Sequence, residues 1–170
     1  MSKVSQRHIE VFAHWLGLPQ PLLMGVLSAT ASRGKEIFSF CYDKAWLKSK
    51  LAPSLDPTLQ LFAGPQYAPP SQKNFGIFLD SSPDRWGRFL MNRREAQRAK
   101  EEGRTPRKLV ESDYLLGVYD EHRMGALRFR LNAEGPFLDH DQQRRFHATM
   151  KRYIALQNAK GCLPNSKIRR

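Results

Sequence analysis

Three short, largely apolar runs near the start of the chain, of which the first and third alternate in the faces of their side chains, constrain the fold more than any other sequence feature. The runs cover residues 9–15, 22–29 and 36–42. Alternation with a period of two places every second side chain on the same face of a β-strand. Only short turns separate the runs. The sequence therefore predicts three strands in an antiparallel meander, with Gly25 marking a bulge or a close approach between strands.

Two later segments also have the character of strands. Residues 126–131 alternate between apolar and basic side chains, which places Leu127, Phe129 and Leu131 on one face of a strand. We expect this strand to return to the first sheet. Residues 58–62 are expected to form a further short strand. The three prolines within residues 64–71 predict an extended loop after it.

Two short helices are expected beside the strands. Asp43 is placed to cap a helix over residues 44–50, and Trp46 of that helix is expected to close one end of the sheet. A second helix is expected over residues 109–116. Its inward residues are expected to be Leu109, Tyr114 and Leu116.

Together these elements predict an α+β fold: a small, mostly antiparallel sheet, made of a meander plus a returning strand, with helices packed on one face or end. A length of 170 residues fits one domain with a tail. We place the domain at residues 1–135 and a basic C-terminal helix and tail at residues 136–170. The helical periodicity lies in residues 141–158, and the tail follows it.

The second half of the chain is organised around residues 75–98, which open with an apolar run and continue as a helix. Ser82 is expected to cap this helix and Pro83 to take its first position. Asp84 then lies in the first turn, where the helix dipole favours a negative charge. The helix is expected to extend into solvent without an apolar stripe until Gly103 ends it.

Trp86 raises the main question about this helix. Trp86, Phe89, Leu90 and Arg93 follow at the spacing of one helical face. A tryptophan in such a stripe is either part of the core or an exposed anchor for a partner, and the sequence leaves both interpretations open. Arg85 and Arg88 beside it either contact a carboxylate or phosphate of a partner or lie on a solvated face.

The same region carries a family resemblance. Residues 78–88, with the sequence FLDSSPDRWGR, resemble the F-x-D-x-x-P-D-x-W-G-R signature in the N-terminal region of HipA-type toxin kinases. Further blocks resemble that family in the same order: Met24 to Leu27, Phe38 to Tyr42 followed by Trp46-Leu47, Ser54 to Pro57, Leu115 to Asp120, and Arg123 to Phe129. The resemblance covers roughly residues 9–131. In the family, a kinase core follows this region, whereas this sequence has no such core.

The net charge of +12 is concentrated in two segments. Residues 141–170 contain eight Lys or Arg and one Asp, a net of +7, and residues 92–108 contain seven Lys or Arg and three Glu, a net of +4. No helix-turn-helix, zinc finger or RNA-binding aromatic motif accompanies them. One interpretation is that these two segments bind nucleic acid, in which case binding would be nonspecific and weakened by salt. The other interpretation is that they are a solvated helix end and tail.

The sequence lacks the residues that catalysis of phosphoryl transfer requires. It contains no glycine-rich phosphate loop and no catalytic loop of the kinase type, and in the HipA family these lie in the kinase core. Asp80 and Asp84 are better explained as residues that cap and charge a helix start than as a catalytic pair. We therefore expect no enzyme activity, catalytic residues, metal site or cofactor. Two distant cysteines and no apolar run of membrane length favour a cytoplasmic protein.

The resemblance implies a binding module of a HipA-type toxin–antitoxin system. Some systems that resemble this family encode the region as a separate small antitoxin, HipS-like, which binds the HipT-like kinase core and neutralises it by occlusion. A DNA-binding antitoxin of the HipB type is a further expected partner, with DNA contacted only indirectly or nonspecifically. The expected contact residues are Ser81, Ser82, Asp84, Arg85, Trp86 and Arg88.

Three alternatives stay open at this point. The chain is a fragment of a longer HipA-like kinase, a nonspecific basic nucleic-acid-binding protein, or an enzyme whose site has no recognisable motif. Binding to a kinase encoded nearby would favour the antitoxin. Salt-sensitive duplex binding that survives deletion of residues 141–170 would favour the nucleic-acid-binding protein.

Overall fold

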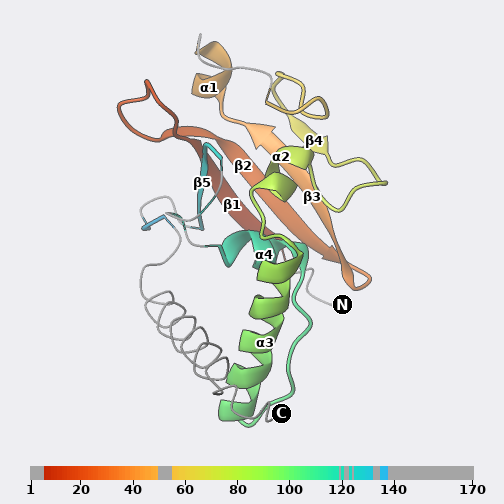
Figure 1. Cartoon of the computed structure of the whole chain (residues 1–170). Helices are drawn as coiled ribbons and strands as arrows, with labels where there is room; N and C mark the ends of the chain where they lie inside the picture. The colour runs from red at the N-terminus through yellow and green to blue at the C-terminus, as the bar shows by residue number, and fades with distance from the viewer. Residues whose placement is uncertain are drawn as a thin grey trace, which may run out of the picture. The chain divides into compact units, whose positions relative to one another are not determined.

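A five-stranded antiparallel sheet forms the centre of the fold (Figure 1). The computed structural model describes residues 6–49, 55–118, 120, 123, 125–131 and 135–137. The strands are β1 (Gln6–Ala13), β2 (Leu22–Ser32), β3 (Lys35–Tyr42), β4 (Pro65–Tyr67) and β5 (Leu127–Arg130). Their spatial order is β4-β3-β2-β1-β5. The predicted meander is confirmed, and so is the return of the last strand, because β5 pairs with β1.

One face of the sheet carries the hydrophobic core. Alternate residues of β1 and β3, among them Val11 and Phe40, point to this face and are fully buried. The short helix α2 (Gly76–Asp80) packs its Phe78 there, with ring centroids 5.3 Å from Phe40 and 6.2 Å from Phe129. The α+β class is therefore confirmed, and a helix covers the sheet face that the alternating pattern predicted to be buried.

Gly25 lies both at a bulge and at a close approach. The pairing of β1 with β2 shifts register between Val11 and Phe12, opposite Gly25. A Cβ atom on Gly25 would lie 2.3 Å from the carbonyl oxygen of Cys41 on β3. Both parts of the prediction for this glycine are confirmed, because only a residue without a side chain fits between the strands.

The first helix follows the prediction closely. Helix α1 (Lys44–Lys48) begins after Asp43, whose carboxylate accepts hydrogen bonds from the amides of Ala45 and Trp46. Trp46 is 2% exposed and meets Trp15 edge to face, with centroids 5.9 Å apart. It therefore closes the end of the sheet, as the sequence indicated.

The strand expected over residues 58–62 is wrong. The Asp56 carboxylate accepts hydrogen bonds from the amide and hydroxyl of Thr58 and folds this segment into a turn. The Gln66 side chain then bonds both backbone groups of Gln60. The strand in this region is β4, which lies inside the proline-containing stretch that was expected to be loop. Local side-chain hydrogen bonds here outweigh strand propensity.

Two inward-facing assignments also need correction. Helix α4 (Glu111–Leu116) starts two residues later than predicted, and the apolar residue it buries fully is Leu115, whereas Tyr114 and Leu116 are only half-buried. Leu131 lies beyond the end of β5 and is exposed, so it does not share the buried face of Leu127 and Phe129.

Helix α3 (Arg85–Glu101) leads away from the sheet (Figure 1) and ends as predicted. Gly103 has a φ of 64°, and the amides of Gly103 and Arg104 donate to the carbonyls of Lys100 and Ala99. This is a Schellman ending, which favours glycine. The expected helix and tail within residues 141–170 lie outside the described residues, and all described residues belong to one compact unit.

Candidate partner-binding site

The turn between α2 and α3 differs from the prediction at the helix start. Asp84, not Ser82, is the N-cap of α3, and its carboxylate accepts the amide of Gly87 at 2.7 Å. The Ser82 hydroxyl instead donates to the carbonyl of Phe78 at 2.8 Å and so belongs to the end of α2. Pro83 consequently precedes the helix. A Cβ atom on Gly87 would lie 2.7 Å from the Pro83 Cβ, so this tight turn requires the glycine.

Trp86 is on the surface. Its side chain is 54% exposed and stacks on Phe89, which is 46% exposed, with ring centroids 5.3 Å apart and planes inclined by 24°. The interpretation of Trp86 as a core residue is therefore wrong, and the alternative that it lies exposed is confirmed. The neighbouring Arg85 is also exposed, and no ion pair links it to another described residue.

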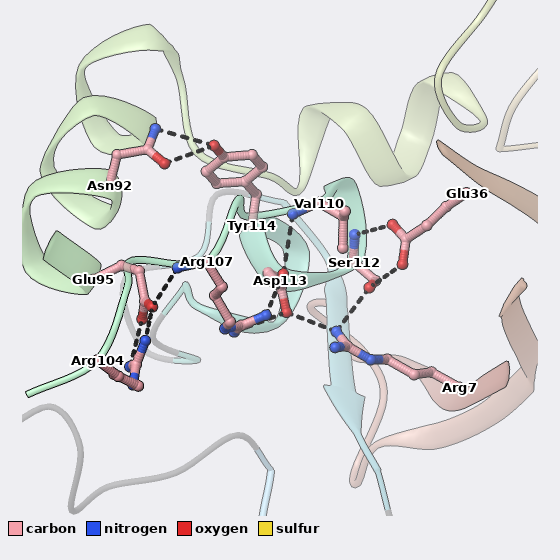
Figure 2. Close-up of polar contacts among 10 residues, drawn as sticks. All are labelled: Arg7, Glu36, Asn92, Glu95, Arg104, Arg107, Val110, Ser112, Asp113 and Tyr114. Carbon is pink, nitrogen blue, oxygen red and sulfur yellow. Dashed lines mark hydrogen bonds and ion pairs between the residues drawn. The ribbon is translucent and has the colours of Figure 1, made fainter. Parts of the chain in front are cut away.

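The opposite face of α3 is polar and is the face that packs. Arg88, Asn92 and Glu95 follow at helical spacing, and each contacts the segment that includes α4. Asn92 exchanges hydrogen bonds with the Tyr114 hydroxyl (Figure 2). Glu95 and Ala99 are buried, so the expectation that this half of the helix lies wholly in solvent is wrong.

The Arg88 side chain connects the start of α3 to the start of α4. Its guanidinium meets the Glu111 carboxylate at 2.9 and 2.8 Å, lies 4.6 Å from the centroid of the Tyr114 ring, and donates to the carbonyl of Pro83. Lys73 approaches the same carboxylate at 3.3 Å. Burial raises the pKa of Glu111, but the hydrogen bonds and charges of Arg88 and Lys73 outweigh it and hold the pKa below its ordinary value.

Glu95 forms the second attachment of α3 (Figure 2). Its carboxylate accepts from the Arg104 guanidinium at 2.6 Å and from the amide of Arg107 at 3.1 Å. The hydrogen bond from Arg104 is the main cause that lowers the pKa of Glu95 to about 2. This contact folds the segment after α3 back along the helix.

A polar network then ties α4 to the sheet (Figure 2). The Asp113 carboxylate pairs with Arg7 of β1 at 2.7 Å and with Arg107 at 2.9 Å, and it accepts the amide of Val110 at 3.0 Å. Burial raises the pKa of Asp113, but these donors outweigh burial and leave it lowered. Glu36 of β3 accepts from both the amide and the hydroxyl of Ser112. Two strands thereby hold the helix on which α3 rests.

Ser81 is not a surface residue. Its side chain is 6% exposed, its hydroxyl donates to the carbonyl of Ile77, and its carbonyl accepts from Arg123 at 2.7 Å. The Ser81 side chain is therefore not presented at the surface, and its role as a contact residue stays a prediction. Ser81 shapes the turn before α3.

Arg123 is a residue that the sequence analysis missed as part of this site. Its guanidinium is buried and donates to three carbonyls, those of Ser81, Leu115 and Val118, and it lies 4.4 Å from the centroid of the Phe129 ring. Burial lowers its pKa to about 10. Arg123 therefore joins the ends of α2 and α4, and it orients the turn from which α3 starts.

The six predicted contact residues thus divide into two groups. Asp84, Arg85 and Trp86 are exposed at the start of α3, whereas Ser81, Ser82 and Arg88 are engaged in holding that start in place. The role of Glu111 could have been predicted from the sequence, because an acidic residue at a helix start is a recognisable local pattern. Arg123 had no local signal for a buried role, and the only indication was its place in the block from Arg123 to Phe129 that resembles the family.

The described residues contain neither a candidate metal-binding group nor a candidate membrane-spanning helix. Among them, no three His, Cys, Asp or Glu side chains gather in a group that could hold a metal ion. In the same part of the chain, every helix is too short or too polar to cross a bilayer. In comparisons with known proteins, no family model, no curated protein and no solved structure matches this chain.

Proposed function

We propose that this protein is a non-catalytic binding module of a HipA-type toxin–antitoxin system in the bacterial cytoplasm. It binds the core of a Ser/Thr kinase toxin and neutralises or completes it. The support is the ordered set of sequence blocks that resemble the HipA N-terminal region, together with the exposed aromatic pair formed by Trp86 of the most specific block and Phe89 directly after it.

The exposed pair Trp86 and Phe89 is the observation that carries the proposal. Helix α3 packs through Arg88, Asn92 and Glu95 and leaves its two large aromatic side chains outside. Most helices bury their apolar face and expose their polar one. An inverted arrangement leaves apolar area in water, and a partner that covers this area would gain the energy of burying it.

The proposed mechanism is occlusion. Trp86 and Phe89 would fill an apolar pocket of the kinase core as one unit, and Arg85 would pair with an acidic group at its rim. Arg88 and Arg123 act as positioning residues, since they hold the turn and the first part of α3. A DNA-binding antitoxin of the HipB type would be a further partner, through which contact with DNA is indirect.

The test uses the core of a HipA-like kinase, taken from a gene near that of this chain, with growth of the host and autophosphorylation of the kinase as readouts. Wild-type chain should bind the core and suppress both toxicity and autophosphorylation, and Trp86→Ala should bind about 100-fold more weakly. The matched control is Tyr67→Ala, because Tyr67 is an exposed aromatic residue of β4.

The possible results separate the variants of this proposal. Binding without protection identifies a lobe that completes the kinase and rules out the neutralising role. Equal binding by wild type and Trp86→Ala rules out the aromatic anchor. An absence of binding to the core by the folded wild-type chain overturns the proposed function.

A further inference from the structure

We propose that the outward face of α3 continues beyond the aromatic pair as a cationic strip, and that this strip binds an acidic surface of the protein partner. The inference rests on the proposed function in one respect, because the partner is the kinase that the aromatic pair would engage. It adds the chemistry of a second contact area.

The strip is defined by residues on one line of the helix. Trp86, Arg93 and Lys100 are exposed and follow one another at intervals of seven residues. Seven residues make nearly two helical turns, so the three side chains lie along one line at intervals of roughly 10 Å. Arg93 also stands 5.7 Å from the centroid of the Phe89 ring, which makes the aromatic and cationic parts continuous.

The acidic side chains of this region do not outweigh the charge of the strip. Residues 85–108 contain nine Lys or Arg and three Glu, a net of +6. Glu95 is bonded to Arg104, and Glu102 is paired with Arg98 and Arg104. The third, Glu101, accepts a hydrogen bond from the neutral amide of Gln97 and keeps its charge, but it forms no ion pair with Arg93 or Lys100.

Two further carboxylates of the domain are also already paired. Glu111 pairs with Arg88 on the packed face of α3, and Asp113 pairs with Arg107 in the segment after that helix. Among the described residues, none of the carboxylates pairs with Arg93 or Lys100. The charge of the outward line is therefore left for a partner of opposite sign, which would gain from complementary potential.

Continuity with the aromatic pair favours a protein over a nucleic acid as this partner. Trp86 and Phe89 are stacked on each other, and Arg93 stands beside the Phe89 ring, so the apolar and cationic parts form one surface. The proposed function assigns the aromatic pair to a pocket of the kinase core, and the cations beyond it would then meet acidic side chains along that pocket. Each ring keeps one face that a nucleobase could stack on, so a nucleic acid is the alternative that the second measurement below tests.

The first test measures association with the kinase core at low and high salt. The double variant Arg93→Glu/Lys100→Glu should associate about tenfold more slowly than wild type at low salt, and the difference should shrink at high salt. The matched control is Lys35→Glu/Lys44→Glu, which changes the net charge equally at exposed positions of β3 and α1. Equal slowing by both double variants would overturn the inference, because it would reflect net charge alone.

A second measurement keeps the inference separate from the proposed function. Residue-resolved amide spectra of the full chain are recorded with a polyglutamate peptide and with a single-stranded oligothymidylate. Shifts at Arg93 and Lys100 with polyglutamate, absent in the double variant, would support the acidic-partner surface even if the kinase core does not bind. Shifts confined to residues outside α3, or tighter binding of the oligothymidylate on the same residues, would overturn it.

Discussion

The guanidinium of Arg88 and the carboxylate of Glu111 form a two-point ion pair, at 2.9 and 2.8 Å, that joins the first turn of α3 to the first residue of α4. Both side chains are mostly buried, and the pair lies beside the hydrogen bonds between Asn92 and Tyr114 that also join the two helices. The pair therefore sets the direction in which α3, with its exposed aromatic pair, leaves the domain.

Breaking this pair should reveal coupling between the two residues. In a double-mutant cycle with Arg88→Ala and Glu111→Ala, we expect a coupling free energy of about 1 kcal/mol. Urea unfolding of the four proteins measures it. The matched pair Arg98 and Glu102, which is exposed and spaced by one helical turn, should couple less. Equal coupling in the two cycles would contradict the structural role given to Arg88.

Truncation of the two tryptophans of α1 and α3 should destabilise the domain to very different extents. Trp46→Ala removes a side chain that is 2% exposed and should lower the free energy of unfolding by about 3 to 5 kcal/mol. Trp86→Ala removes a side chain that is 54% exposed and should cost less than about 1 kcal/mol. Urea unfolding measures both. A large loss of stability in Trp86→Ala would mean that its effect on binding reports folding rather than contact.

Replacement of Arg123 should be strongly destabilising. Arg123→Met leaves the carbonyls of Ser81, Leu115 and Val118 without their donor, and we expect a loss of about 3 kcal/mol in the free energy of unfolding. Arg123→Lys keeps the charge but not the fork of donors, so it should recover only part of this loss. Full stability of Arg123→Lys would show that charge, and not the geometry of the three hydrogen bonds, is what matters.

The stability of the domain should fall in acid. A carboxylate whose pKa is lower in the folded state stabilises that state above its unfolded pKa, and the contribution is lost as the pH falls. For Glu95 this window extends from its ordinary value of 4.5 down to about 2. Glu111 and Asp113, also lowered, act with the same sign.

The variant Glu95→Gln isolates the contribution of this one carboxylate. It should be less stable than wild type at pH 7, and the difference should shrink as the pH falls through the window of Glu95. Urea unfolding at pH 7 and near pH 2 tests this. The control is Glu101→Gln, which removes a carboxylate that accepts from Gln97 on the exposed side of α3. An unchanged difference at both pH values would contradict the role of the Glu95 charge.

A methyl group at Gly25 should disrupt the centre of the sheet. The added Cβ atom would lie 2.3 Å from a backbone oxygen of β3, and a strand in the middle of the sheet has little room to yield. We expect Gly25→Ala to cost about 3 kcal/mol, measured by thermal or urea unfolding. A cost below about 1 kcal/mol would show that β2 and β3 can separate locally.

The local pattern of the sequence was enough to predict the meander, the Asp43 cap and the end of α3 at Gly103. Each of these depends on residues within a few positions of one another: alternation along a strand, a carboxylate beside its amides, or a glycine at positive φ. The same local reasoning failed at residues 58–62, where the Gln66 side chain closes a turn from outside the segment.

Only the tertiary structure decided which face of α3 is packed and which is exposed. The helical spacing of Trp86 and Phe89 is the same whether they lie in a core or on a surface. The outcome depends on Glu111, Tyr114 and Arg104, because these residues hold the polar face of the helix and come from later in the chain. Ion pairs and hydrogen bonds between distant segments leave no periodic trace in the sequence, whereas the burial of a strand face does.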